Sequence, residues 1–200
     1  MAIVQRIKGI CLKPKDEWQV IAAETSSTTD LLKNYVAPLA AIGAVAGFIG
    51  MSFIGVSAFG ISVRMPLVTG LVGAVIGFVA ALVEVYVLAL IIDALAPKFG
   101  GEKNIAQALK ISAYSFTPAL VAGVLRIIPA LGVLALLASL YGVYLLYLGL
   151  PRLMKAPPEK AVNYTLVVVA CAIGIFLVIG VVTGAIVGAG TVATVGLQPH

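Results

Sequence analysis

Five long apolar segments, separated by short charged ones, set the strongest limit on how this chain can fold. The first has no charged side chain between Lys33 and Arg64. Only 10% of all residues are charged, against about 25% in soluble domains, so the bilayer is the natural solvent. The sequence therefore predicts an all-α fold, a polytopic membrane bundle with five transmembrane helices. A spanning helix needs about 20 apolar residues, and the five spans are expected within residues 35–61, 65–95, 111–126, 130–150 and 163–187.

The basic residues indicate how the bundle is oriented. With five spans, 11 of the 13 lysines and arginines fall on the side that holds the N-terminus. Only Arg64 and Arg126 fall on the other side. Lysine and arginine in short loops favour the cytoplasmic side. We therefore expect an integral protein of the cell membrane with a cytoplasmic N-terminus and its C-terminus outside.

The N-terminal segment, residues 1–34, is expected to be amphipathic and to precede the five-span domain of residues 35–200. Ile3, Ile7 and Ile10 recur at helical spacing, with basic residues beside them. This composition is typical of a short helix that lies in the plane of the lipid headgroups.

A second short helix is expected to begin at Pro14, because proline is well tolerated at the first position of a helix. Trp18 lies on its apolar face, and tryptophan prefers the membrane interface. Ser27 with Asp30 resembles the start of a further helix. The segment either anchors the protein to the membrane surface or binds a partner, and the sequence leaves both readings open.

A polar stretch, DALAPKFGGEKN (residues 93–104), separates the second span from the third. Its motif Pro97, Phe99, Gly100 and Gly101 predicts a tight cytoplasmic turn. Proline cannot continue a helix interior, and glycine can adopt positive φ and reverse the chain. The stretch has neither of the glycine patterns that bind nucleotide phosphates.

Four polar residues in or near the spans are candidate functional residues, namely Glu84, Asp93, Lys110 and Tyr114. A carboxylate inside a span costs at least a few kcal/mol unless it is paired, protonated or hydrated. Glu84 is therefore either functional or held by a structural hydrogen bond, and Asp93 is either functional or a solvated helix end. Lys110, Tyr114 and Pro118 stack on one helix face, and we expect this stripe to meet Glu84. The alternative is a plain proline kink with a lysine at the interface.

No recognised arrangement of catalytic residues is present in the sequence. The one histidine is His200, at the end of the chain. Cys11 and Cys171 do not form a CxxC motif, and GMSFIG (residues 50–55) is one residue too long for a nucleophile elbow. We therefore expect no enzyme, no catalytic residue, no metal site and no cofactor. Nucleic-acid binding is not expected either, because no soluble basic module is present.

Small residues recur four positions apart in three of the expected spans. Glycine at this spacing lets helix backbones approach closely. The contacts lie either within the chain, which is the simpler reading, or between this chain and another copy or partner. The motifs are Gly43/Gly47, Gly73/Gly77 and Gly180/Gly184/Gly188.

Four stretches, spread over most of the chain, resemble the Yip (Ypt-interacting protein) family in its prokaryotic branch. They are LKPKDEW (12–18), LAPKFGGEKN (95–104), ALKISAYSFTPALVAGVLRIIPALG (108–132) and LYGVYLLYLGLPRLMKAPPEKA (140–161). The resemblance implies a five-span helical domain with a cytosolic N-terminus. Eukaryotic members resemble trafficking scaffolds that engage prenylated small GTPases. This chain lacks their Asp-Leu-Tyr-Gly-Pro motif and has a short N-terminal segment, which makes GTPase binding doubtful.

The sequence is consistent with two different functions. The first is a non-enzymatic membrane scaffold or partner-binding protein, which the resemblance and the glycine motifs favour. The second is a small oligomeric transporter or channel that uses intramembrane acids, which Glu84 and the proline-broken third span favour. A hydrated cavity that reaches Glu84 would favour transport, whereas a closed bundle would favour the scaffold.

Overall fold

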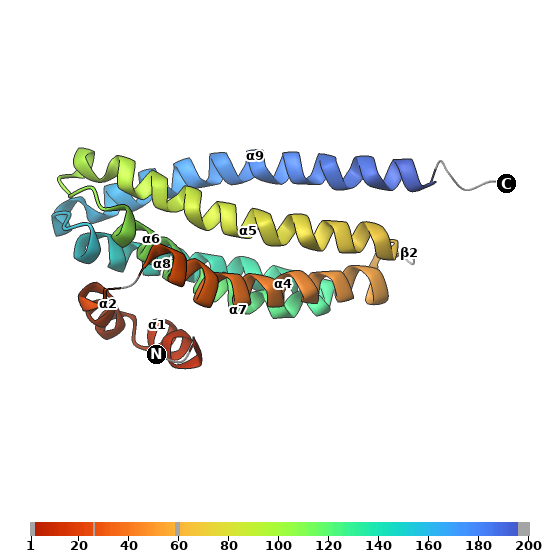
Figure 1. Ribbon diagram of the computed structural model, residues 1–200, viewed down its shortest axis with the longest axis horizontal. Helices are drawn as coiled ribbons and strands as arrows, with labels where there is room; N and C mark the ends of the chain where they lie inside the picture. Colours follow the sequence, from red (N-terminus) through yellow and green to blue (C-terminus); the bar gives the residue numbers. More distant parts are fainter. Residues whose placement is uncertain (1–2, 26, 59–60, 196–200) are drawn as a thin grey trace.

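Five helical segments in the computed structural model are long and apolar enough to cross a membrane, which confirms the predicted bundle. The structure describes residues 3–25, 27–58 and 61–195, so His200 lies outside the described residues. The segments lie roughly along one common axis (Figure 1). They are Thr28–Ile54, Leu67–Phe99, Ile105–Ile127, Pro129–Leu153 and Pro158–Gly188.

Regular elements account for most of the described chain. Two short segments are π-helical, Leu32–Val36 and Gly50–Ile54. Four short segments are 3₁₀-helical, namely Ala96–Phe99, Gly123–Ile127, Pro129–Leu131 and Pro158–Lys160. The α-helices and strands are α1 (Ile3–Leu12), α2 (Pro14–Ala23), α3 (Thr28–Leu31), α4 (Ala37–Ile49), β1 (Val56–Ala58), β2 (Ile61–Val63), α5 (Leu67–Leu95), α6 (Ile105–Ser115), α7 (Thr117–Ala122), α8 (Gly132–Leu153) and α9 (Ala161–Val195).

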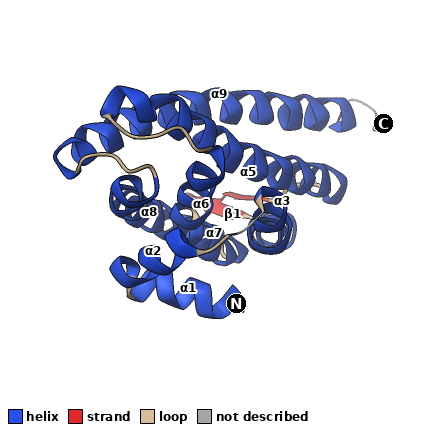
Figure 2. Cartoon of the chain, turned by 60° about the vertical axis from the view of Figure 1, so that its left-hand side comes forward, coloured by secondary structure: helices blue, strands red, loops and turns tan. Residues whose placement is uncertain are grey.

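The bundle has two different ends (Figure 1). The strand end carries β1 and β2, and α9 runs toward the C-terminus there. The turn end carries the connection between α5 and α6 and the connection between α8 and α9. Helices α1 and α2 lie beside the bundle below α7 and α8, as the turned view shows (Figure 2).

The third span, α6 with α7, is the most deeply packed of the five. In its most apolar stretch 56% of the residues are buried, against 17–28% in the other spans. Its hydroxyls bond to neighbouring helices: Ser112 Oγ donates to Val85 O on α5 at 2.6 Å, and the hydroxyls of Tyr35 and Thr117 lie 2.8 Å apart. Polar groups inside a bilayer need partners within the protein, so the other helices surround this one.

The first span begins and ends earlier in the chain than residues 35–61, where it was expected. It begins at Thr28, where Ser27 Oγ accepts a hydrogen bond from Asp30 N at 3.2 Å, as the predicted start motif requires. It ends at Ile54, because Gly55 has a φ of 79° and leaves the helix. β1 then pairs antiparallel with β2 in a two-stranded hairpin. The apolar run alone could not locate either boundary.

The polar stretch between the second and third spans forms the predicted tight turn. Gly100 has a φ of 77°, a left-handed conformation that suits glycine. Gly101 N donates to Ala96 O at 2.9 Å and Glu102 N donates to Met154 O at 2.9 Å, which ties the turn to the end of α8. Phe99 stacks on Tyr164 of α9, with ring centroids 4.8 Å apart. The turn therefore joins α5, α8 and α9 at one end of the bundle.

Gly101→Val should reduce folded protein in detergent. A Cβ at this position would lie 2.7 Å from Met154 O and 3.3 Å from Ala96 O, so a side chain forces the backbone apart. We expect a loss of stability of about 1–3 kcal/mol, the usual cost of overpacking. The measurement is monodisperse yield and thermal stability by size-exclusion chromatography, with exposed Lys103→Gln as the control. Equal values for both variants would contradict a constrained turn.

Candidate functional site

The N-terminal helix pair, α1 and α2, packs its apolar face against the bundle. Ile10, Trp18 and Ile21 are fully buried. The Trp18 ring meets Tyr114 of α6 edge-on at 6.3 Å, and a Cβ on Gly149 of α8 would lie 3.0 Å from the same ring. The amphipathic face predicted from the isoleucine spacing is therefore covered by the third and fourth spans of the same chain.

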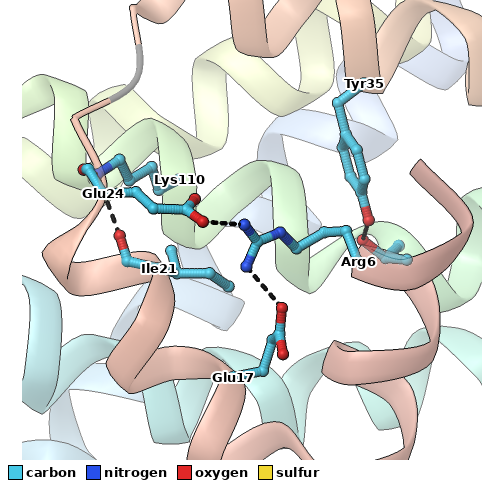
Figure 3. Close-up of polar contacts among 7 residues, drawn as sticks. Arg6, Glu17, Ile21, Glu24, Tyr35 and Lys110 are labelled. Atoms are coloured by element: carbon cyan, nitrogen blue, oxygen red, sulfur yellow. Dashed lines mark hydrogen bonds and ion pairs between the residues drawn. The ribbon is translucent and has the colours of Figure 1, made fainter. Parts of the chain in front are cut away.

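A charged cluster lies under this helix pair (Figure 3). The Arg6 side chain is 5% exposed, and its Nη1 donates to Glu17 Oε1 at 2.6 Å. Its Nη2 donates to Glu24, and the guanidinium carbon stands 5.4 Å from the centre of the Tyr114 ring. We call Arg6, Glu17, Glu24, Lys110 and Tyr114 the Arg6 cluster. It joins both helices of the pair to α6.

Electrostatics keep the Arg6 guanidinium charged at its buried position. Burial lowers its pKa, but the hydrogen bond to Glu24 and the nearby negative charges outweigh that effect, so the pKa is raised overall. Breaking a buried ion pair leaves an uncompensated charge, which is strongly destabilising. The cluster therefore acts as a clamp that holds α1 to α2.

Lys110 completes the cluster from the third span. Its Nζ donates to Ile21 O at 3.2 Å and to Glu24 O. These carbonyls lie where α2 ends, and the last carbonyls of a helix need partners from outside it and carry partial negative charge. The lysine is 3% exposed and so serves as a buried cap for α2.

The structure does not bring the predicted stripe to Glu84, which corrects that expectation. Lys110 and Tyr114 face the N-terminal helix pair, where their partners are. Glu84 instead lines a cavity on another side of the bundle. Asp93, further along α5, is half-buried, and its Oδ1 has no hydrogen-bond partner in the described part of the chain. The four polar candidates thus belong to three separate places.

The lateral cavity lies between α4, α5, the end of the third span and α9. It has a volume of about 710 Å³, which is within the usual range of about 300–1,000 Å³ for ligand-binding pockets. Among the described residues that line it, eight are glycines and only Glu84 and Arg126 are charged. Glu84 is half-buried and Arg126 is exposed. Neither makes a hydrogen bond or a direct ion pair within the described ranges, although Arg126 is close enough to act on Glu84 electrostatically.

The glycine motifs are used in two different ways. On α4, Gly43 packs against Gly123: a Cβ on Gly123 would lie 3.1 Å from Gly43 Cα. On α5 and α9, a Cβ built at Gly77, Gly180 or Gly184 would meet nothing within 4 Å. The first motif therefore makes a close contact within the chain, as the simpler reading expects. In the second motif a Cβ on Gly73 would lie 3.8 Å from Val187 of α9, whereas Gly77 faces open cavity space. In the third motif Gly180 and Gly184 line the same cavity.

From the sequence, Arg6 was interpreted only as a basic residue beside the apolar face of the first helix, and its buried ion pairs with Glu17 and Glu24 were not predicted. The signal was present, since Arg6 lies three residues after Ile3 and four before Ile10, on the same helix face as both. A charge at the centre of an apolar face predicts a buried partner. The position of Glu17 and Glu24 opposite it depended on the fold of the helix pair.

The chain is similar to known membrane proteins over most of its length. The Yip1 domain family matches residues 8–193. Two curated relatives, each described as inner membrane protein YohC, come from Escherichia coli strains K12 and O6:H1. Each is 26% identical over 166 residues, which cover 81% of this chain and 85% of the relative. No solved structure matches.

Arg6→Gln should loosen α1 from α2 while the five spans stay folded. The change removes the charge that pairs with Glu17 and Glu24, which breaks the clamp. We expect the amide hydrogens of α1 and α2 to exchange at least about tenfold faster, a shift of about 1.4 kcal/mol or more in local opening. Exchange is measured by mass spectrometry in detergent, and exposed Lys8→Gln is the matched control. Unchanged protection of α1 and α2 in Arg6→Gln would show that the ion pairs do not hold them.

Proposed function

The chain belongs to the Yip1 domain family, and on that premise we propose that it is a non-enzymatic membrane scaffold that binds a transmembrane helix of a partner protein in its lateral cavity. The observation that carries this proposal is the open space beside Gly77, Gly180 and Gly184. Small residues four apart are the surfaces on which membrane helices approach each other closely. Here Gly77 of α5 and the pair Gly180 and Gly184 of α9 face open cavity space, while Gly73 lies beside Val187 of α9.

The charges in the cavity support a specific partner. Glu84 and Arg126 form no direct ion pair in the described residues and act on each other only over a longer distance. A charge in or near a span is costly until it is paired or hydrated. A partner helix with a basic or amide side chain at the depth of Glu84 would satisfy that carboxyl group. The proposed partner is therefore a helix with a small-residue face and one polar side chain.

Gly184→Leu should block partner binding without unfolding the protein. A Cβ at Gly184 meets nothing within 4 Å, so the larger side chain fills cavity space rather than clashing with the fold. Gly174→Leu is the matched control on the same helix, because that position is equally open but does not line the cavity. We expect capture of partners from native membranes to fall at least about tenfold for Gly184→Leu only. Equal capture by both variants would contradict the proposed binding site.

Transport is the second candidate function, and one observation favours it. The cavity reaches Glu84, which lies inside the second span. Intramembrane carboxylates that face a hydrated cavity mark ion and proton pathways. A transporter of this kind would use Glu84 to bind a cation or a proton.

Glu84→Gln separates the two candidates. The amide keeps the shape of the side chain and removes its charge, so the variant should fold like the parent. Under the scaffold proposal, proteoliposomes of the parent and the variant show the same background flux of protons and monovalent cations. Flux in the parent that Glu84→Gln abolishes would replace the scaffold by a transporter.

We also propose that the turn end of the bundle faces the cytoplasm, on the strength of the basic residues at that end. In a background with Cys11 and Cys171 replaced by alanine, a cysteine at Lys103 should be protected from a membrane-impermeant maleimide in intact cells. A cysteine at Arg64, near the strand end, should react at once. Both residues are exposed, so folding does not decide their reactivity. The reverse labelling pattern would invert the topology.

A further inference from the structure

A second cavity lies at the turn end, between the end of α8 and the start of α9. Its volume is about 630 Å³, and its lining includes Tyr147, Arg152, Lys155 and Pro157. It is separate from the lateral cavity, which α8 does not line. The proposed binding of a partner helix in the lateral cavity does not involve this second cavity.

The charge of this cavity is positive. Arg152 is exposed and has no ion pair or hydrogen bond from its side chain within the described ranges. Lys155 pairs with Glu102 at 2.7 Å, but both side chains are about two-thirds exposed (69% and 67%). An ion pair this exposed contributes little, so a stronger anion can compete for the lysine. The two basic residues of the cavity, Arg152 and Lys155, therefore have only the carboxylate of Glu102 paired with them, which leaves a net positive charge.

The depth of the cavity matches the lipid headgroups. The outer face of α8 is apolar and exposed at Leu140 and Val143 and changes to tyrosine at Tyr144 and Tyr147. Tyrosine prefers the boundary between hydrocarbon and headgroups. Arg152 follows Tyr147 by five residues, about 7.5 Å along the helix axis. That distance places the guanidinium among the headgroup phosphates.

The backbone of Lys155 is held in an unusual conformation. Its φ is 53°, and among the described residues it is the one non-glycine with positive φ. The neighbouring Met154 O accepts a hydrogen bond from Glu102 N at 2.9 Å, so the turn between α5 and α6 holds this conformation. Strained backbone that the surroundings maintain is typical of ligand-binding positions.

We infer that this cavity binds the headgroup phosphate of an anionic phospholipid, with Arg152 and Lys155 as the binding residues. The arginine fork can bind two phosphate oxygens at once, and lysine adds a point charge. Basic pockets between transmembrane helices at the cytoplasmic surface bind anionic headgroups in this way. The acyl chains would lie along the exposed apolar face of α8.

The test is lipid binding to the purified full-length protein in detergent, measured by native mass spectrometry. Phosphatidylglycerol is titrated against phosphatidylcholine. We expect the parent protein to prefer phosphatidylglycerol, and the double variant Arg152→Gln/Lys155→Gly to lose about tenfold in that affinity, with phosphatidylcholine unchanged. Glycine at 155 keeps the positive φ, and Arg152→Gln alone should show part of the same loss without changing the turn.

The matched control is Lys98→Gln/Lys103→Gln, which removes two exposed charges at the same end but outside the cavity. Equal losses in the two double variants would reduce the effect to general surface charge and overturn the site. Displacement of bound phosphatidylglycerol by inorganic phosphate would assign the site to a free anion rather than to a lipid. Retained preference in the cavity variant would overturn the inference outright.

Discussion

The need to satisfy polar groups on the third span, in a solvent that offers no hydrogen bonds, is the constraint on which this fold depends. Ser112, Thr117 and Lys110 lie on one short helical segment, and each of them finds a partner elsewhere in the chain. The partners come from the second span, the first span and the N-terminal helix pair in turn. Lipid could supply none of these bonds. The third span is therefore central, and the remaining helices take positions around it.

The same constraint explains why the two sides of the bundle differ. On the side of the N-terminal helix pair, the buried charges of Arg6 and Lys110 are matched by carboxylates and helix-end carbonyls. On the side of the lateral cavity, Glu84 and Arg126 have opposite charges that act on each other without forming a direct ion pair, and Gly77, Gly180 and Gly184 face open space. Charged groups that line an open cavity without a direct ion pair favour binding on that side of the bundle. The scaffold proposal and its transport alternative both start from that contrast.

The sequence predicted the features that depend on local physics. The five spans follow from apolar length, the turn at Gly100 from glycine backbone freedom, and the amphipathic helices from isoleucine spacing. It did not predict which surfaces meet. Lys110 was expected to face Glu84, but it faces α2, because helix rotation and the docking of a separate segment are set by long-range packing. The open cavity, likewise, depends on how α4, α5 and α9 pack together, which is set by long-range contacts.

The docking of the N-terminal helix pair on the third span is the central claim, and the protein carries its own probe for it. Trp18 is the one tryptophan in the chain, and it is fully buried against Tyr114 and Gly149. Its fluorescence in reconstituted vesicles should be blue-shifted and nearly unaffected by aqueous iodide or by brominated phospholipids. Strong quenching by brominated lipid would place the helix pair in the bilayer interface, and strong quenching by iodide would place it in water. Either result would contradict the docked arrangement.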